Sequence, residues 1–387
     1  MGNLKRSREN RRRTRARGDK LWSMSQAIHE LPDETEMRRA FAAKNPAYDG
    51  TFFVAVRTTG VFCRPVCRAK PPRAENIEFF PTAQAALRRG YRACKLCRPL
   101  EPAGAQPALV RRLLDLVEAS PMRRVTGDDL RELGVDPSTA RRQFLAHCGT
   151  SFAGYQRARR LGTAVREMRT GRSAAFAGVG AGFQSDSAFR NAVERTFGLS
   201  TSRVGGSAIL TSAWLPTPLG NMLAVAHDNG IVLLDFADRA TLEPTIATLR
   251  ARFAAERTDA VIVPGEHRHL TMLATELTNY FAGAGRMFTV PICPAGTDFE
   301  RRAWDALRAI PFGQTRSYGQ QAASMGDARA VRAVGRANGR NTINILIPCH
   351  RVIAASGDLT GYGGGLARKR WLLRHEQRIA ADSRHFG

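Results

Sequence analysis

The chain has 387 residues, which is enough for two or three domains of ordinary size. Hydrophobic residues make up 43% of the chain and charged residues 24%, a balance typical of folded proteins with packed cores. Its 59 Lys and Arg against 34 Asp and Glu give a net charge of +25, so we expect a polyanionic partner. No apolar run approaches the ~20 residues of a membrane helix, and no apolar signal core follows the basic N-terminus. We therefore expect a cytoplasmic protein that binds nucleic acid, and neither a membrane protein nor an exported one.

Residues 1–36 form a basic extension in which the first 23 residues are rich in arginine and almost without apolar side chains. Basic runs without apolar periodicity stay solvated. We therefore expect a disordered segment and assign it no function. The alternative that translation begins at Met24 stays open.

The first folded domain is expected over residues 37–101. From Asp49 to Cys63, β-branched and aromatic residues lie between turn residues, which predicts short strands, and a helix is expected from Thr82 to Gly90. Two close cysteine pairs have the spacing of a four-thiolate zinc site, Cys63-x3-Cys67 and Cys94-x2-Cys97. The spacing leaves open whether zinc only supports the fold or also activates a thiolate.

Residues 108–204 are expected to be helical, after a linker at 101–107 that is rich in Pro, Ala and Gly. Two helix-turn-helix pairs are predicted, at 128–149 and 173–198. Each pairs a short helix with a Gly-containing turn and a second helix that begins at Asp or Ser. An apolar stripe at helical spacing precedes them, formed by Leu109, Val110, Leu113, Leu114 and Val117.

A second linker is expected at 204–207, where the sequence reads VGGS, before an α/β segment at 210–295. Within that segment Asp228-Asn229-Gly230 is a strong hairpin signal. Helices are expected around 241–257 and 267–284.

The last domain, residues 296–380, carries a candidate nucleophile. The sequence PCHR at 348–351, which we expect on a strand, places a thiol directly before an imidazole. A cysteine reacts as the thiolate, and a nearby histidine can take its proton. A buried, inert thiol is the alternative. Cys148 and Cys293 lack a partner cysteine nearby in the sequence and are expected to be core or incidental thiols.

The sequence DGTFFVAVRTTGVFCRPVCRAKPP, with RACKLCRP further on, resembles the N-terminal domain of the Ada adaptive-response proteins. The resemblance implies that Cys63 is both a zinc ligand and the acceptor of a methyl group from a DNA methylphosphotriester. The other implied ligands are Cys67, Cys94 and Cys97, and the implied contacts to the DNA backbone are Thr59, Arg68, Lys70 and Arg92. Methylation would convert a thiolate to a thioether and remove a negative charge beside the phosphates, which is expected to strengthen promoter binding.

The sequence RAVGRANGRNTINILIPCHRVI, with PFGQTRSYGQQAA upstream and GYGGGLARKRWLLRHE downstream, resembles the O6-alkylguanine-DNA alkyltransferases. The resemblance implies that Cys349 accepts the alkyl group, that His350 takes its proton through water, and that Glu376 orients the histidine. The other implied roles are Tyr318 as donor to the leaving guanine, Arg332 as the residue that replaces the flipped base, and Asn341 as the brace of the active-site loop.

The sequences GVDPSTARRQF and GFQSDSAFRNAVERTFGLS resemble the paired helix-turn-helix domain of AraC-type regulators. Recognition helices near 138–147 and 185–196 would enter successive major grooves. Gly178 and Gly180 depart from the pattern, since each glycine weakens a helix by about 1 kcal/mol. The candidate DNA contacts are Arg141, Arg142 and Arg190, for which a solvated basic face is an equal explanation.

The predicted fold is multidomain α+β. It has a small α/β zinc domain, an all-α double helix-turn-helix domain, an α/β alkyltransferase N-terminal subdomain, and a helical, winged-helix-like C-terminal domain. We expect a methylated-DNA–protein-cysteine methyltransferase that moves methyl groups irreversibly from O6-methylguanine, and O4-methylthymine, to Cys349, and from methylphosphotriesters to Cys63. Transfer to Cys63 is expected to switch the protein into a transcriptional activator.

The expected partners are one zinc ion, double-stranded DNA and RNA polymerase, for a monomer associated with the bacterial nucleoid. The alternative is a zinc-containing AraC-type transcription factor that senses alkylated DNA without efficient repair.

Overall fold

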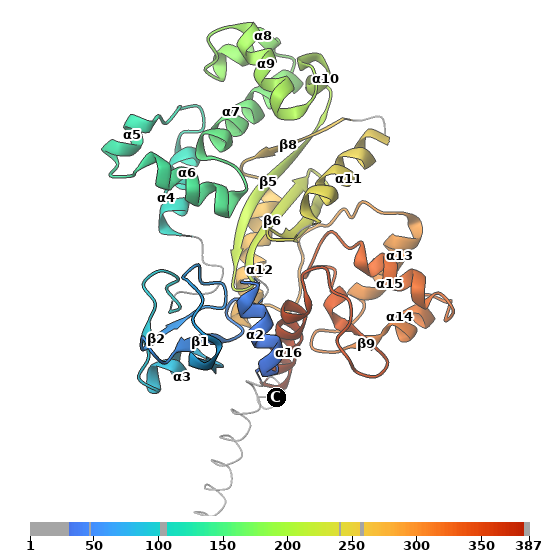
Figure 1. Cartoon of the computed structure of the whole chain (residues 1–387). Helices are drawn as coiled ribbons and strands as arrows, with labels where there is room; N and C mark the ends of the chain where they lie inside the picture. The colour runs from blue at the N-terminus through green and yellow to red at the C-terminus, as the bar shows by residue number, and fades with distance from the viewer. Residues whose placement is uncertain (1–30, 46–47, 101–106, 240, 256–258, 383–387) are drawn as a thin grey trace, which may run out of the picture. The chain divides into compact units, whose positions relative to one another are not determined.

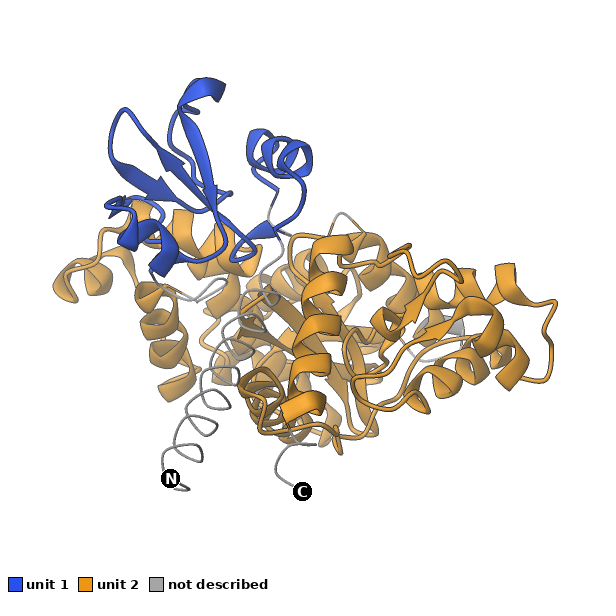
Figure 2. Cartoon of the chain, turned by 90° about the horizontal axis from the view of Figure 1, so that it is seen from below, with its two compact units in different colours: residues 1–103 blue, residues 104–387 orange. Residues whose placement is uncertain are grey.

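The computed structural model describes residues 31–45, 48–100, 107–239, 241–255 and 259–382 (Figure 1). The chain divides into two compact units, residues 1–103 and residues 104–387 (Figure 2). Most of the basic extension and the linker at 101–106 lie outside the described residues. Among the described helices, none is both long and apolar enough to cross a membrane.

The first unit contains a four-stranded sheet with the order β3-β1-β2-β4, in which β1 pairs antiparallel with β2 and β3, and β2 pairs parallel with β4. The short strands expected before Cys63 are confirmed. The strands are β1 (Phe53–Val56), β2 (Val61–Cys63), β3 (Ile77–Phe80) and β4 (Arg92–Ala93), with the 3-10 helix η2 (Ala74–Asn76) before β3.

Two helices, α2 (Glu34–Ala42) and α3 (Ala83–Arg88), complete the first unit. Asp33 begins α2 by accepting a hydrogen bond from the Glu36 backbone N at 2.8 Å, so ordered structure starts before the expected boundary at residue 37. Met37 of α2 belongs to the same apolar cluster as Val54 of β1 and Ile77 of β3. The expected helix at 82–90 is confirmed as α3, whose N-cap is Thr82.

The second unit begins with helices that confirm both expected helix-turn-helix pairs, α5 with α6 and α8 with α9. Figure 1 shows α7 running from the α4–α6 group to the α8–α10 group. The helices are α4 (Ala108–Ala119), α5 (Gly127–Glu132), α6 (Pro137–Cys148), α7 (Phe152–Arg169), α8 (Ala174–Gly180), α9 (Asp186–Phe197) and α10 (Thr201–Gly205). A Cβ at Gly178 would lie 2.9 Å from the Phe189 ring, so this glycine lets α8 and α9 pack closely.

The segment expected as a linker at 204–207 is a packed connection instead. Val204 lies in α10, is fully buried, and shares an apolar cluster with Leu161 of α7 and Val263 of a strand in the following sheet. Arg203 and Asp259 also form an ion pair at 2.8 Å. Two glycines and a serine resemble a linker in sequence, but burial of the neighbouring valine holds this connection in place.

The following sheet has the order β7-β6-β5-β8, antiparallel except for the parallel pair of β5 and β8. The predicted hairpin at 228–230 is confirmed, since it joins β6 to β7. Helices α11 and α12 confirm the two expected helices, and α12 packs on the sheet. The elements are β5 (Ala208–Thr217), β6 (Gly220–His227), β7 (Gly230–Phe236), α11 (Leu242–Ala255), β8 (Ala260–Pro264) and α12 (Arg268–Ala282).

The C-terminal part is mostly helical. Capping boxes begin two of its helices, Thr297 with Glu300 at α13 and Ser317 with Gln320 at α14. The PCHR sequence is not a strand as expected, because its last three residues form the 3-10 helix η3. The elements are α13 (Asp298–Arg308), β9 (Arg316–Ser317), α14 (Tyr318–Ser324), α15 (Val331–Gly339), η3 (Cys349–Arg351), β10 (Val352–Ile353) and α16 (Leu366–Asp382).

Candidate active sites and metal centre

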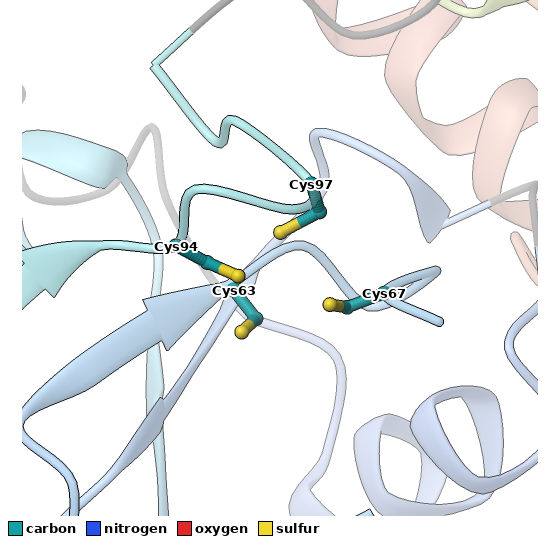
Figure 3. Close-up of side chains that lie close together, drawn as sticks. All are labelled: Cys63, Cys67, Cys94 and Cys97. Carbon is teal, nitrogen blue, oxygen red and sulfur yellow. The ribbon is translucent and has the colours of Figure 1, made fainter. Parts of the chain in front are cut away.

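The four paired cysteines of the first unit come together at one end of its sheet. Cys63 ends β2 and Cys94 directly follows β4. Because these strands are parallel neighbours, both cysteines lie at the same end of the sheet. Figure 3 shows the side chains of Cys63, Cys67, Cys94 and Cys97 gathered around one point, and their sulfur atoms all lie within 4.8 Å of one another. Tetrahedral zinc with Zn–S bonds of about 2.3 Å separates its sulfur ligands by about 3.8 Å. The cluster therefore fits one zinc ion.

Crowding and burial change the acidity of these thiols. The hydrogen bond to Cys97 and burial raise the pKa of Cys63, and burial raises the pKa of Cys67 to about 11. The hydrogen bond from Cys63 lowers the pKa of Cys97 to about 6, and the Arg64 backbone N also donates to its sulfur at 3.3 Å. Four thiolates this close together, two of them buried, need a nearby cation, which a bound dication supplies.

Arg64 braces the metal centre, although the sequence analysis did not single it out. Its side chain is buried and donates to Asp49 Oδ2 at 3.0 Å and to the Arg98 carbonyl at 3.3 Å. Arg98 follows the second cysteine pair, so Arg64 ties the two cysteine segments together. The only signal in the sequence was its place directly after Cys63.

The residues expected to contact DNA differ in their availability. All of the candidates on the first unit are exposed, namely Thr59, Arg68, Lys70 and Arg92. On α6, Arg141 and Arg142 are exposed, and Arg142 donates to Thr139 at 3.2 Å. On α9, Arg190 is paired with Asp186 at 2.7 Å, so it would have to exchange that partner to bind a phosphate.

Cys349 is held in a buried loop that Asn341 braces. Cys349 is 6% exposed, and Asn341 donates from Nδ2 to the Cys349 Sγ at 3.2 Å and to the Ile347 carbonyl at 2.8 Å. Burial raises the pKa of the Cys349 thiol, and the Asn341 hydrogen bond with the Lys369 and Arg239 charges opposes that rise. A base is therefore needed to make the thiolate near neutral pH.

His350 is placed to be that base. It is fully buried, and its Nε2 lies 2.9 Å from Oε1 of Glu376, which is also fully buried. Since the ionised carboxylate only accepts, Nε2 carries the proton and Nδ1 can accept one. Nδ1 is buried, and no residue in the described ranges hydrogen-bonds to it. Burial lowers the pKa of His350 while Glu376 opposes that effect, so the ring is neutral and ready to accept a proton.

Glu376 is the centre of this network. Burial by itself would raise its pKa, but His350 and Arg351 outweigh burial and lower the pKa well below its usual range. Arg351 donates from Nε at 2.8 Å and from a terminal nitrogen at 3.0 Å, the Tyr280 hydroxyl donates at 2.9 Å, and the Gly313 backbone N at 3.1 Å. The sequence analysis missed Tyr280, which lies 96 residues before Glu376 and has no motif of its own.

A buried lysine shapes the loop over the site. Lys369 is fully buried, and its Nζ donates to the Val352 carbonyl at 2.5 Å and to the Thr360 carbonyl at 2.6 Å. Burial lowers the pKa of Lys369 to about 8, while the nearby Cys349 opposes that shift. The Tyr318 hydroxyl donates to the same Thr360 carbonyl at 3.3 Å, so Tyr318 reaches the loop that Lys369 holds. Arg332 is exposed, near the start of α15.

Replacing Glu376 with glutamine will reduce the free energy of unfolding of the second unit by about 3–5 kcal/mol at neutral pH, because Arg351 loses its buried counter-charge. The folded pKa of Glu376 lies below the usual value near 4.5. The carboxylate therefore stabilises the protein above that value, and the contribution is lost as pH falls through the lowered pKa. The variant should lack this part of the acid dependence. Denaturant unfolding between pH 3 and 7 measures it, with the exposed Glu194→Gln as control, and equal unfolding curves for both variants would contradict the expectation.

Three parts of the chain match known families. Residues 36–100 match the metal binding domain of Ada, residues 130–205 a helix-turn-helix domain, and residues 298–378 the 6-O-methylguanine DNA methyltransferase, DNA binding domain. Over 344 residues the chain is 35% identical to the bifunctional transcriptional activator/DNA repair enzyme Ada of Escherichia coli, covering 86% of this chain and 94% of that protein. The chain belongs to the Ada family.

Membership of the Ada family confirms the resemblance found in the sequence. With the four-cysteine cluster, the match to the Ada metal binding domain also confirms one zinc ion as cofactor. The C-terminal part is 45% identical over 156 residues to the methylated-DNA–protein-cysteine methyltransferase of Mycobacterium tuberculosis, covering 40% of this chain and 93% of that protein.

Two solved structures resemble parts of this Ada-family chain. One is Mycobacterium tuberculosis OGT in complex with DNA, with 38% identity, a TM-score of 0.37, and coverage of 44% of this chain and 94% of that chain. The other is the methylated N-ADA/DNA complex, with 32% identity, a TM-score of 0.27, and coverage of 33% of this chain and 98% of that chain.

Proposed function

We propose that the chain repairs alkylated DNA by moving methyl groups irreversibly onto two of its own cysteines. Cys349 would take them from O6-methylguanine and O4-methylthymine, and Cys63 from methylphosphotriesters. The observation that carries the proposal is the buried Glu376–His350 pair, whose histidine is the residue directly after Cys349 and keeps Nδ1 able to accept a proton. The net charge of +25 and the family matches support DNA as the substrate.

The transfer from guanine is a single displacement. Nδ1 of His350 takes the Cys349 proton through a water molecule, and the thiolate sulfur attacks the methyl carbon. The S–C bond forms as the C–O6 bond breaks, and the electron pair goes to the guanine. Tyr318 hydrogen-bonds or protonates the leaving base, since burial raises its pKa and keeps its hydroxyl protonated. Arg332, exposed on α15, would fill the space that the flipped base leaves in the duplex.

Methyl transfer at the metal centre would also be a single displacement. The Cys63 sulfur forms a bond to the methyl carbon as the C–O bond of the triester breaks, and the phosphate leaves as a diester anion. Zinc, when bound, keeps the cysteine sulfurs anionic near neutral pH. Exposed Arg68, Lys70 and Arg92 would hold the neighbouring phosphates. Conversion of one thiolate to a thioether then removes a negative charge beside those phosphates and strengthens promoter binding.

The test uses duplex DNA with an isotopic label on the methyl group, either at O6 of guanine or on a phosphotriester. Peptide mass spectrometry should find the label on Cys349 with the first substrate and on Cys63 with the second. Label on neither cysteine would leave the alternative of a zinc-containing AraC-type factor that senses alkylated DNA without repair. The switch fails if Cys63→Ser with zinc retained still shows promoter binding induced by damaged DNA.

Three helices would bring this chemistry to DNA. Helix α15 would be the recognition helix of a winged-helix-like C-terminal domain, and α6 and α9 would enter successive major grooves at promoters. The protein would act as a monomer on the nucleoid, in the cytoplasm of a bacterium, and would contact RNA polymerase. Support comes from the family matches and from the basic charge of the chain.

A further inference from the structure

A cavity of about 400 Å³ lies between α11, β7 and the segment from Gly339 to Thr342. Three arginines and four threonines give it much of its polar character, namely Arg239, Arg252, Arg340, Thr241, Thr245, Thr248 and Thr342. We call it the arginine cavity. Cys349 is not among its lining residues, so it is distinct from the acceptor site, although Asn341 forms part of its wall.

Positive charge exceeds negative charge around this cavity. Arg239 pairs with Asp235 at 2.7 Å, whereas Arg252 and Arg340 share Glu300 at 3.4 and 3.0 Å. Both carboxylates are buried, so the surroundings hold three guanidinium groups against two carboxylates.

Most donors of the two arginines on Glu300 remain available. A guanidinium has five N–H donors. Within the described part of the chain, Arg252 and Arg340 each make one side-chain hydrogen bond, to Glu300. Glu300 can accept few further hydrogen bonds from the two arginines, because its Oε2 also accepts from the Thr297 backbone N at 2.8 Å, which caps α13. An incoming anion would find N–H donors from two guanidinium groups on different elements.

Part of the cavity lining is apolar. Val232, Leu233 and Leu249 line it and are nearly or fully buried, so their surfaces are fixed by the core. A volume of this size lies in the range of small-molecule sites, and planar guanidinium groups both bind phosphate oxygens and stack on flat rings. The combination suits a molecule with a phosphate at one end and an apolar or planar body at the other.

We propose that the arginine cavity is a binding site for a small phosphate ester of nucleotide size. Arg252 and Arg340 hold the phosphate, and the Val232, Leu233 and Leu249 wall contacts the body of the ligand. DNA itself is a poor occupant, because a continuous duplex cannot enter a cavity of this volume. The site does not depend on methyl transfer, so the proposal stands or falls separately from the repair function.

The test is isothermal titration of the zinc-loaded full chain with guanosine monophosphate, with inorganic phosphate and with guanosine. Saturable binding of the monophosphate, weakened at least about tenfold in the double variant Arg252→Gln/Arg340→Gln, is expected. Thr248→Phe fills the cavity without changing its charge and should weaken binding as strongly. Arg308→Gln, an exposed arginine on α13 outside the cavity, should bind like the unchanged protein.

Three outcomes would overturn the proposal. One is the absence of saturable binding of both phosphate probes. The second is binding of guanosine as tight as that of its monophosphate, and the third is monophosphate binding that neither variant weakens. Thermal unfolding of each variant shows whether it is folded. Thr248→Phe keeps both arginines that pair with Glu300 of α13, so it still tests the site if loss of the arginines destabilises that helix.

Discussion

Replacing Cys349 with alanine will abolish methyl transfer from O6-methylguanine, because the variant lacks the proposed acceptor sulfur, on the residue directly before His350, that would form the S–C bond. Cys349 is 6% exposed and accepts a hydrogen bond from Asn341, so loss of its small sulfur should leave the loop folded. Single-turnover incubation with labelled duplex DNA measures the transfer. Methyl transfer from phosphotriesters to Cys63, in the other unit, should be unchanged.

The matched control for this variant is Cys148→Ala. Cys148 is also buried, at 3% exposed, and burial raises its pKa to about 12, so it is a thiol that stays protonated. The Cys148→Ala variant should therefore transfer methyl groups at the rate of the unchanged protein. Residual transfer in Cys349→Ala, or an equal loss in Cys148→Ala, would show that the acceptor has been assigned to the wrong residue.

Loss of zinc will unfold the first unit and leave the second unit folded. Structural zinc sites contribute about 10–16 kcal/mol to folding, which exceeds the whole stability of a small domain. The first unit has only two small apolar clusters, one around Phe52 and one around Phe62, among its described residues. We therefore expect chelation, or Cys67→Ala, to make this unit sensitive to protease.

Limited proteolysis followed by mass spectrometry gives the readout. Fragments from residues 31–100 should disappear, while residues 107–382 remain and still transfer methyl groups to Cys349. Cys148→Ala is again the control, because Cys67 and Cys148 are equally buried at 3% exposed, and only Cys67 lies in the metal cluster. Persistence of the first unit after verified zinc removal would show that its apolar clusters suffice.

The zinc ligands could be predicted because the two cysteines of each pair are only a few residues apart in the sequence. Two residues separate Cys94 from Cys97 and three separate Cys63 from Cys67, so each pair can face one ion regardless of the rest of the fold. Helices α6 and α9 could be predicted for a similar reason, since their N-caps Asp136 and Ser185 act within one turn. Signals that act over so few residues can be recognised without knowledge of the tertiary structure.

Other expectations from sequence failed where packing outweighs local preference. VGGS has the composition of a linker, yet Val204 is buried against α7 and the sheet. That Gly178 weakens its helix stays a prediction, and the structure adds that its lack of a Cβ provides the space that Phe189 needs. Amino-acid composition indicates how flexible a segment is by itself. Burial of one neighbouring side chain in the folded protein can fix such a segment in place.

The sequence by itself determined the reactive groups of this protein. It identified a strongly basic chain and a histidine next to Cys349, and it predicted two acceptor cysteines and a four-sulfur metal site. Only the tertiary structure decided how the acceptor site is supported, because Tyr280 and Gly313 meet Glu376 across 96 and 63 residues of chain. The arginine cavity likewise combines residues from α11 and the end of α15. Spacing and periodicity encode contacts within a few residues, whereas contacts between distant segments depend on which surfaces the fold buries together.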